Sequence, residues 1–233
     1  MLSHMLRAAA GLFKPPSFVG GATATSNNGG NFNVSLTALT GGLASAPSQD
    51  DLVIVVTAVG DDTACDVSGY TLIATVSTTI STLWIGRKFM GATPDTSLTV
   101  TGSGTNTQGA AAIAYVWRGV NTTTPMDVTT TTSSATNTGI PNPPSITPVT
   151  QGAVILAAGS VGYDSTSRTL SSSSLSNFFN ATANLSGGNT DATAGVGWRS
   201  WTSGAYDPPA FTLSGSDSTL FMSCAATMAL RPK

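Results

Sequence analysis

The sequence predicts an all-β protein, an antiparallel β-sandwich (jelly-roll-like) built from two related halves. Two observations carry this prediction: strand motifs that occur twice, and a composition that disfavours helices. All eleven acidic residues are aspartate, and Ser, Thr, Gly and Asn dominate the polar positions. Glutamate is a good helix former, whereas Ser, Thr, Asp and Asn compete for backbone hydrogen bonds and favour turns.

Three motifs of the first half return in the second half. Residues 51–60 are echoed by 152–161, 98–103 by 211–216, and 116–118 by 229–231. The first match is offset by 101 residues and the other two by 113, so the second copy carries about twelve extra residues. Two copies are too few for a solenoid. We therefore predict one domain over 17–233, with halves at about 51–120 and 152–232 joined by a crossover at 121–151, and an N-terminal arm over 1–16.

Short apolar or alternating runs between turn residues predict the strands. They cover 18–25, 33–39, 52–59, 70–76, 82–89, 97–101 and 110–117. In the last run, large Ile113, Tyr115 and Trp117 alternate with small residues such as Ala112 and Ala114. We expect the large face in the core, and the small face under a neighbouring element or against another subunit. Residues 226–230 repeat this alternation in phase, which matters because a one-residue slip exchanges the two faces.

The second half and the crossover add two further expectations. Residues 121–148, rich in Thr, Ser, Asn and Pro, form an edge strand in part or a plain crossover, since proline is tolerated at edges. Residues 165–191 form the insertion of the second half, and we expect them to be its most exposed surface.

The charge content excludes several classes of function. Only 9% of residues are charged, against about 25% in a typical soluble protein, and the net charge is −2. Without a basic cluster beyond Arg87 and Lys88, no nucleic-acid partner is expected. No run of 18 apolar residues predicts a membrane span. The first 13 residues do not resemble a signal peptide, so folding in a cytosol with reduced thiols is expected.

The N-terminal arm carries the one helical pattern of the sequence. Its apolar residues recur at three- and four-residue steps, which gives one stripe, and the candidate docking residues on it are Leu2, Met5, Leu6, Leu12 and Phe13. Pro15 and Pro16 end the pattern. The segment is either a docked or frayed terminus or an arm that clamps a neighbouring subunit.

The residues offer little catalytic or metal chemistry. His4 is the sole histidine and lies in the arm, so we predict no catalytic residue, no cofactor and no enzymatic activity. The acidic loop at Asp61, Asp62 and Asp66 is either an ordinary solvated turn or a weak calcium candidate, and no metal site is predicted from it. Cys65 and Cys224 are interpreted as a loop thiol and a buried strand thiol, and the alternative is a bridge between the two halves.

The candidate ligand or interface aromatics are Trp198, Trp201 and Tyr206. Trp198 and Trp201 are three positions apart, so in an extended strand they face opposite sides. One of the two is therefore expected at the surface. It either packs in an interface or belongs to a platform for stacking a glycan.

A set of scaffold motifs resembles a widespread group of tailed-bacteriophage and prophage virion proteins. These motifs lie at residues 18–24, 34–42, 51–56, 68–71, 90–96, 116–119 and 224–232. The resemblance runs from about residue 17 to 232 and includes no catalytic residue. Residues 1–16 depart from the group, whose members begin near the motif at residue 18.

The resemblance implies a structural virion protein on the outer surface of a particle assembled in the host cytoplasm. We expect it to decorate or cement the capsid, with major capsid or tail proteins as partners, and to be a homo-oligomer, with a trimer as the working expectation. One alternative is a tail-associated protein that binds a host-surface glycan or receptor. Another is a secreted carbohydrate-binding module.

Overall fold

The computed structural model describes residues 14–63, 65–102, 108–136, 139–163, 168–185, 190–214 and 221–233. Within these ranges the chain forms strands and turns and no helix, which confirms the predicted all-β class. The strands are β1 (Ser17–Ser26), β2 (Phe32–Ser35), β3 (Leu52–Val59), β4 (Thr71–Ser77), β5 (Thr82–Phe89), β6 (Ser97–Val100), β7 (Ala110–Arg118), β8 (Thr131–Ala135), β9 (Val154–Tyr163), β10 (Leu170–Ser171), β11 (Ser176–Ala183), β12 (Asp191–Ser200), β13 (Thr212–Leu213) and β14 (Met222–Leu230). Of the predicted helix or arm over 1–16, residues 1–13 lie outside the described residues.

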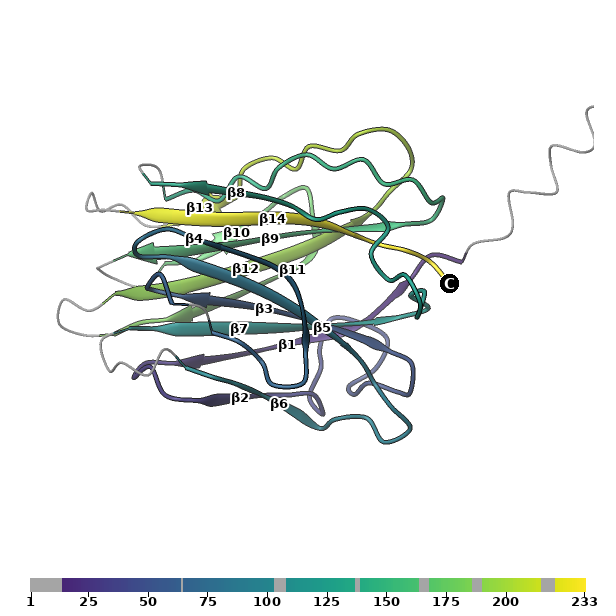
Figure 1. Cartoon of the computed structure of the whole chain (residues 1–233), viewed down its shortest axis with the longest axis horizontal. Helices are drawn as coiled ribbons and strands as arrows, with labels where there is room; N and C mark the ends of the chain where they lie inside the picture. The colour runs from purple at the N-terminus through teal and green to yellow at the C-terminus, as the bar shows by residue number, and fades with distance from the viewer. Residues whose placement is uncertain are drawn as a thin grey trace, which may run out of the picture.

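The strands up to β7 form one main antiparallel sheet and those from β8 onward form the other, and the two sheets face each other (Figure 1). The first has the order β1-β7-β3-β5-β4, and the second, starting from its other edge, has the order β8-β14-β9-β12-β11. The orders match strand for strand. The halves do not exchange strands, so the repeat seen in the sequence is a repeat of whole sheets. The segment at 121–148 supplies edge strand β8, so its edge-strand interpretation is confirmed for Thr131–Ala135.

The ladder registers correct the sequence alignment of the two halves. Trp117 pairs with Leu52 in the first sheet, and Leu230 pairs with Val154 in the second. Equivalent positions of β7 and β14 are 113 residues apart in the sequence. These pairings therefore place equivalent positions of β3 and β9 102 residues apart, and not the expected 101. The expected alignment was wrong by one residue, because two short apolar runs can be matched in either phase. The one-residue shift matters because it would exchange the two faces of the strand.

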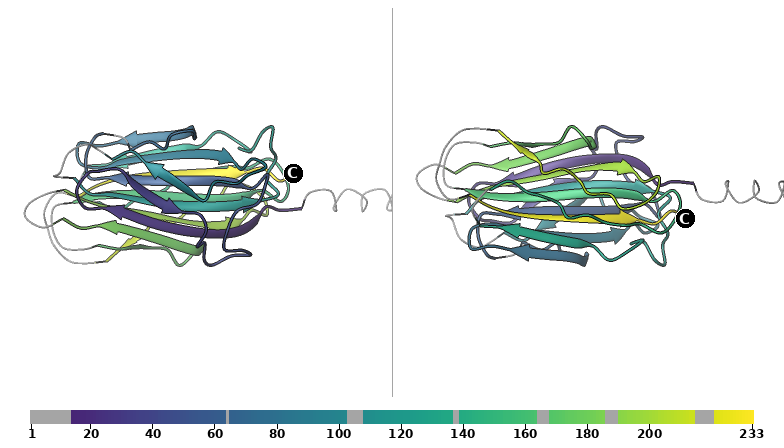
Figure 2. Two further views of the ribbon diagram at one scale, coloured as in Figure 1. Left: turned by 90° about the horizontal axis from the view of Figure 1, so that it is seen from below. Right: turned by 90° about the horizontal axis from the view of Figure 1, so that it is seen from above.

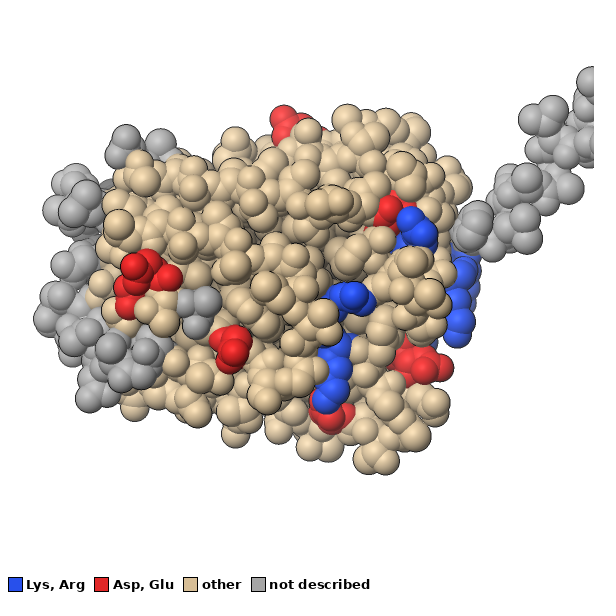
Figure 3. Space-filling model, viewed as in Figure 1, with Lys and Arg blue, Asp and Glu red and all other residues tan. Residues whose placement is uncertain are grey.

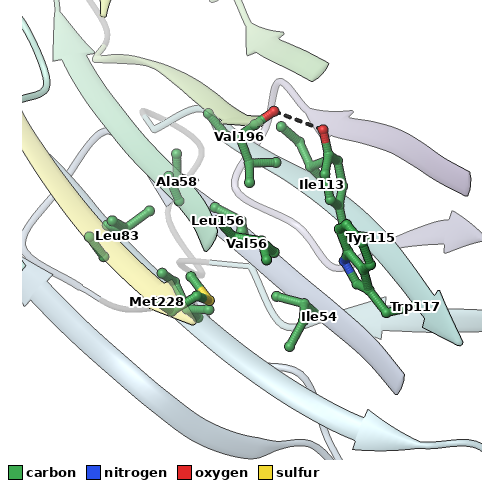
Figure 4. Packing of buried hydrophobic residues seen from close by; sticks show 14 of the residues in the cluster. Ile54, Val56, Ala58, Leu83, Ile113, Tyr115, Trp117, Leu156, Val196 and Met228 are labelled. Carbon is green, nitrogen blue, oxygen red and sulfur yellow. Dashed lines mark hydrogen bonds between the residues drawn. The ribbon is translucent and has the colours of Figure 1, made fainter. Parts of the chain in front are cut away.

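A single apolar core fills the space between the sheets and draws on both halves. Large residues of β7, among them Tyr115 and Trp117, lie in this core together with Leu156 of β9 and Met228 of β14 (Figure 4). The prediction that the large face of β7 points inward is therefore confirmed. The Tyr115 hydroxyl donates a hydrogen bond across the core to the Val196 carbonyl, at 2.9 Å. Complete burial of these side chains stabilises the fold by about 1.5–3 kcal/mol each.

Two small sheets cover the outer faces. The pair β2-β6 lies outside the first sheet (Figure 1), and β10-β13 lies outside the second. Ala112 and Ala114 pack under the first pair with Val34 and Val100. The small face of β7 is thus covered by another element of the same chain, which confirms the first of the two alternatives. The second alternative, a neighbouring subunit on that face, is wrong. Small residues suit this face because the covering strands approach it closely.

The expected insertion at 165–191 contains strands and core residues. It includes β10 and β11, and Leu170, Leu175 and Ala183 are buried. The expectation that this segment forms the most exposed surface was wrong for its described part. Its serine-rich composition resembled a loop, but β11 is the counterpart of β4 and places alternate residues against the core.

The two ends of the described chain lie at the same end of the sandwich. Lys14 and Lys233 line one hollow there, and Figure 2 shows β1 beginning beside the C-terminus in both views. The Lys233 N–H donates a hydrogen bond to the Gly119 carbonyl at 2.9 Å. The face drawn in Figure 3 is largely uncharged, with Lys and Arg gathered toward this end.

Candidate functional site

The three candidate aromatics lie in two different places. Trp198 is directed into the space between the sheets, where its ring packs edge-on against Trp117 with centroids 5.3 Å apart. Trp201 and Tyr206 pack on the opposite, outer face of the second sheet, with Ile146 and Ile155. The expectation that Trp198 and Trp201 face opposite sides is met. Trp198 is therefore a core residue, and only the other two can form a surface site.

The turn after β12 holds Trp201 in place. β12 ends at Ser200, and the Trp201 N–H donates to the Ala153 carbonyl at 3.0 Å. The indole Nε1–H donates to the Gly204 carbonyl at 2.8 Å. Gly204 has a φ of +71°, a conformation that glycine adopts without strain. The turn thus fixes both the backbone and the ring of Trp201.

Tyr206 is held by a short backbone pairing with the crossover segment. Its N–H and the Ile146 carbonyl are 2.8 Å apart, and the reverse bond measures 2.9 Å. The Arg199 guanidinium carbon lies 4.3 Å from the centroid of the Tyr206 ring. Contact of a guanidinium with an aromatic face contributes about 0.5–1 kcal/mol at an exposed position. Arg199 and Tyr206 therefore position each other.

These residues enclose a hollow of about 200 Å³ on the outer face of the second sheet. Arg199, Trp201 and Tyr206 form its walls together with Ile155, Ser200, Thr202, Ser203 and Ala205. Arg199 was not predicted as a site residue. The signal that could have found it was its position two residues before Trp201, which places both on the same side of an extended chain.

Two polar groups at this hollow have no partner in the described part of the chain. Arg199 takes part in none of the three ion pairs there, and no hydrogen bond from its guanidinium to a described residue is present. The Tyr206 hydroxyl is buried and likewise lacks a hydrogen-bond partner among described atoms. Buried polar groups in folded proteins are nearly always paired. Of the two, the guanidinium of Arg199, which lines the hollow, is the donor that a ligand can reach, because the Tyr206 hydroxyl has almost no accessible surface.

The acidic loop has a local structure of its own. The Asp61 carboxylate accepts hydrogen bonds from the Asp62 N–H at 2.7 Å and the Thr63 hydroxyl at 3.3 Å, and the Gln108 amide also donates to it. The hydrogen bond and charge of Asp61 raise the pKa of Asp62. No group of three acidic, His or Cys side chains arranged to hold a metal occurs among the described residues. The geometry there is that of a solvated turn.

The two thiols are free and buried in different clusters. Burial, helped by the charge of Asp66, raises the pKa of Cys65 to about 12. Burial also raises the pKa of Cys224, whose Sγ lies 3.3 Å from the Ser81 carbonyl oxygen. A bridge between the halves is thereby ruled out in this fold, and neither thiol is poised as a nucleophile.

Of the four outer strands of the two main sheets, β4 is the one with no described hydrogen bond to any segment beyond its sheet neighbour. Residues 40–44 hydrogen-bond to the backbone of β1, side chains of β8 bond to carbonyls of 142–145, and side chains of β11 bond to residues 168–170 and to Gly41. In the described part of the chain, β4 has hydrogen bonds to β5 alone. It carries no charge, and Leu72 on it is 52% exposed. Natural sheets normally block such an edge with charge, proline or a cover.

The candidate docking residues Leu2, Met5, Leu6, Leu12 and Phe13 lie outside the described residues. The described chain begins beside a hollow of about 520 Å³ that is lined by Lys14, Leu43, Arg118 and Lys233 among others. Leu43 is 66% exposed at this end.

No protein-family model, curated protein or solved structure matches this chain. None of the described segments forms a helix of the length and apolarity needed to cross a membrane.

Proposed function

We propose that the protein is a structural subunit of a tailed-phage virion that decorates or cements the outside of the capsid. In this role it acts through non-covalent contacts with other virion proteins and with copies of itself, and has no catalytic role. The phage assignment rests on the resemblance of the scaffold motifs. The observation that carries the structural role is the bare, uncharged edge of β4.

An open sheet edge is suited to assembly because its free N–H and C=O groups can pair with a strand of a neighbour. β4 runs over seven residues, Thr71–Ser77, which is the length of an ordinary strand. Leu72 adds apolar area beside these backbone groups. One such contact is weak, but contacts repeated by the symmetry of a particle reinforce each other through effective concentration.

The test places charge on this edge. Replacing both Leu72 and Thr75 by lysine should leave the fold intact, because both side chains are exposed, and should abolish attachment to particles that lack the protein. Val149→Lys is the matched control, since Val149 is 68% exposed and lies outside β4. Attachment of the double variant at the wild-type level would remove β4 from the proposal.

Electron cryomicroscopy of the intact particle tests the location. Many symmetry-related copies spread over the shell mean a capsid subunit, whereas a single ring at the tail means a tail protein. Absence of the chain from the particle would overturn the virion assignment.

A second candidate is favoured by a separate observation, the hollow at Trp201 and Tyr206. Aromatic rings beside hydroxyl groups suit recognition of a glycan, because a pyranose ring is apolar on its faces and polar around its rim. In this alternative the protein is tail-associated and binds a glycan or receptor of the host surface.

A further inference from the structure

We propose that the hollow at Arg199, Trp201 and Tyr206 binds a single carboxylated sugar residue, such as a uronic acid or a sialic-type acid. The inference goes beyond the structural role and can fail or succeed independently of it. A site with these three residues should prefer acidic glycans, whereas Trp201 and Tyr206 alone would also accept neutral ones.

The guanidinium of Arg199 gives the preference for an acid. Its guanidinium carbon lies 4.3 Å from the centroid of the Tyr206 ring, a contact that uses the charge of the group while no described hydrogen bond occupies its N–H donors. No carboxylate of the described chain pairs with it. Arginine matches a carboxylate with two parallel N–H···O bonds, which are stronger than bonds between neutral groups. A ligand carboxylate supplies the partner that Arg199 lacks.

The indole of Trp201 gives the surface for the sugar ring. It lines the hollow and packs against the cluster of Ile146, Ile155 and Ala229. Its Nε1–H is already bonded to Gly204, so the ring cannot turn away and offers a fixed apolar face. Rings held in advance bind with a smaller entropy cost than mobile ones.

Hydroxyl groups around the hollow complete the site. Ser200, Thr202 and Ser203 lie on its rim and can exchange hydrogen bonds with sugar hydroxyls. With a volume of about 200 Å³, the hollow suits one sugar residue, and the rest of a chain would extend over the surface.

The experiment compares acidic sugars with their uncharged counterparts. Oligomers of galacturonic acid and 3′-sialyllactose are titrated against the full-length protein, with oligomers of galactose and lactose as the uncharged counterparts, and binding is followed by ligand-observed NMR. The acidic sugars should bind at least roughly tenfold more tightly than the neutral ones. Acetate at the same concentration should not displace them, because it lacks the stacked ring.

Variants assign the preference to single side chains. Arg199→Ala should remove the difference between acidic and neutral sugars, and Arg199→Lys should restore only part of it, because lysine has charge without the fork. Trp201→Ala should weaken both kinds of sugar. Arg87→Ala is the control, since Arg87 is an arginine of the first sheet, outside the lining of the hollow, and it should leave binding unchanged.

Each other outcome overturns the proposal. No binding of either acidic sugar at millimolar concentration would do so, as would equal binding of acidic and neutral sugars. Equal competition by acetate would show a simple anion site. A circular dichroism spectrum and unfolding midpoint close to the wild type would confirm that each variant remains folded.

Discussion

Gly60 and Gly162 occupy equivalent positions 102 residues apart, one just after β3 and the other within β9, and each lies against the backbone of the opposite sheet. A Cβ on Gly60 would come within 2.6 Å of the Thr190 carbonyl oxygen, at the start of β12. A Cβ on Gly162 would overlap the Ile80 carbonyl, two residues before β5. β5 and β12 are themselves equivalent, so each half contacts the other in the same way.

These two glycines should be intolerant of alanine. Gly162→Ala and Gly60→Ala should each lower the free energy of unfolding by about 1–3 kcal/mol, because overpacking against backbone cannot be relieved by moving a side chain. In a chain of this size that corresponds to roughly 2–4 °C in Tm per kcal/mol. Thermal unfolding followed by circular dichroism measures the change.

Gly91→Ala is the matched control for this pair. Gly91 follows β5, and a Cβ there would meet nothing within 4 Å. The free energy of unfolding of the Gly91→Ala variant should stay the same or rise slightly, since alanine restricts the unfolded chain. Equal losses at Gly91 and Gly162 would show that close contact between the sheets is not the cause.

Asp127 should dominate the stability of the crossover segment. Its carboxylate is buried and accepts hydrogen bonds from the Val149 N–H at 2.6 Å, the Thr150 N–H at 3.0 Å and Arg231 Nε at 3.1 Å. Removal of one partner from a buried pair is costly, so Asp127→Ala should destabilise the protein by about 3 kcal/mol. The pair Lys88–Asp95 is more exposed, and Asp95→Asn should cost about 0–1 kcal/mol.

The same carboxylate predicts part of the acid dependence. Burial raises the pKa of Asp127, but the hydrogen bonds from Thr150, Val149 and Arg231 outweigh it and lower the pKa below 3.8. A lowered pKa in the folded protein means that the stabilisation is complete above the unfolded pKa and is lost as the pH falls through the folded one. The stability difference between wild type and Asp127→Asn should therefore shrink below about pH 3.8. Urea unfolding at several pH values tests this, and a difference that grows toward low pH would contradict it.

Both thiols should be unreactive in the folded protein. Cys65 and Cys224 are buried and their pKa values are raised, so they remain protonated at neutral pH. A thiol reagent such as DTNB should react slowly with the native protein. After unfolding in urea, it should react readily with both cysteines. An intact mass that reveals a disulfide, or fast reaction of the native form, would contradict the fold.

Much of the fold could be predicted because the strands follow simple patterns. The bounds expected for β3 and β5 agree with the structure, since both are apolar runs closed by clear turn residues. The inward face of β7 followed from the size alternation around Tyr115, because the period of a strand is two. The edge strand β8 was one of two alternatives, because a threonine-rich run suits both a strand and a loop.

The candidate site was only half predictable. Trp198 and Trp201 were expected on opposite faces. Which of them faces outward depends on the register of β12, and this register is set by pairing with β9, a strand distant from β12 in the sequence. Arg199 had one signal in the sequence, its position two residues before Trp201, and its contact with Tyr206 had none. That contact depends on the backbone pairing of Tyr206 with Ile146, 60 residues earlier in the chain.

Calorimetric unfolding of the whole chain tests most directly whether the two sheets form one cooperative unit around their shared core. The account predicts a single transition whose calorimetric and van't Hoff enthalpies agree, and Gly162→Ala should move that transition as a whole to lower temperature. Two separate transitions, with only one of them shifted by Gly162→Ala, would contradict it.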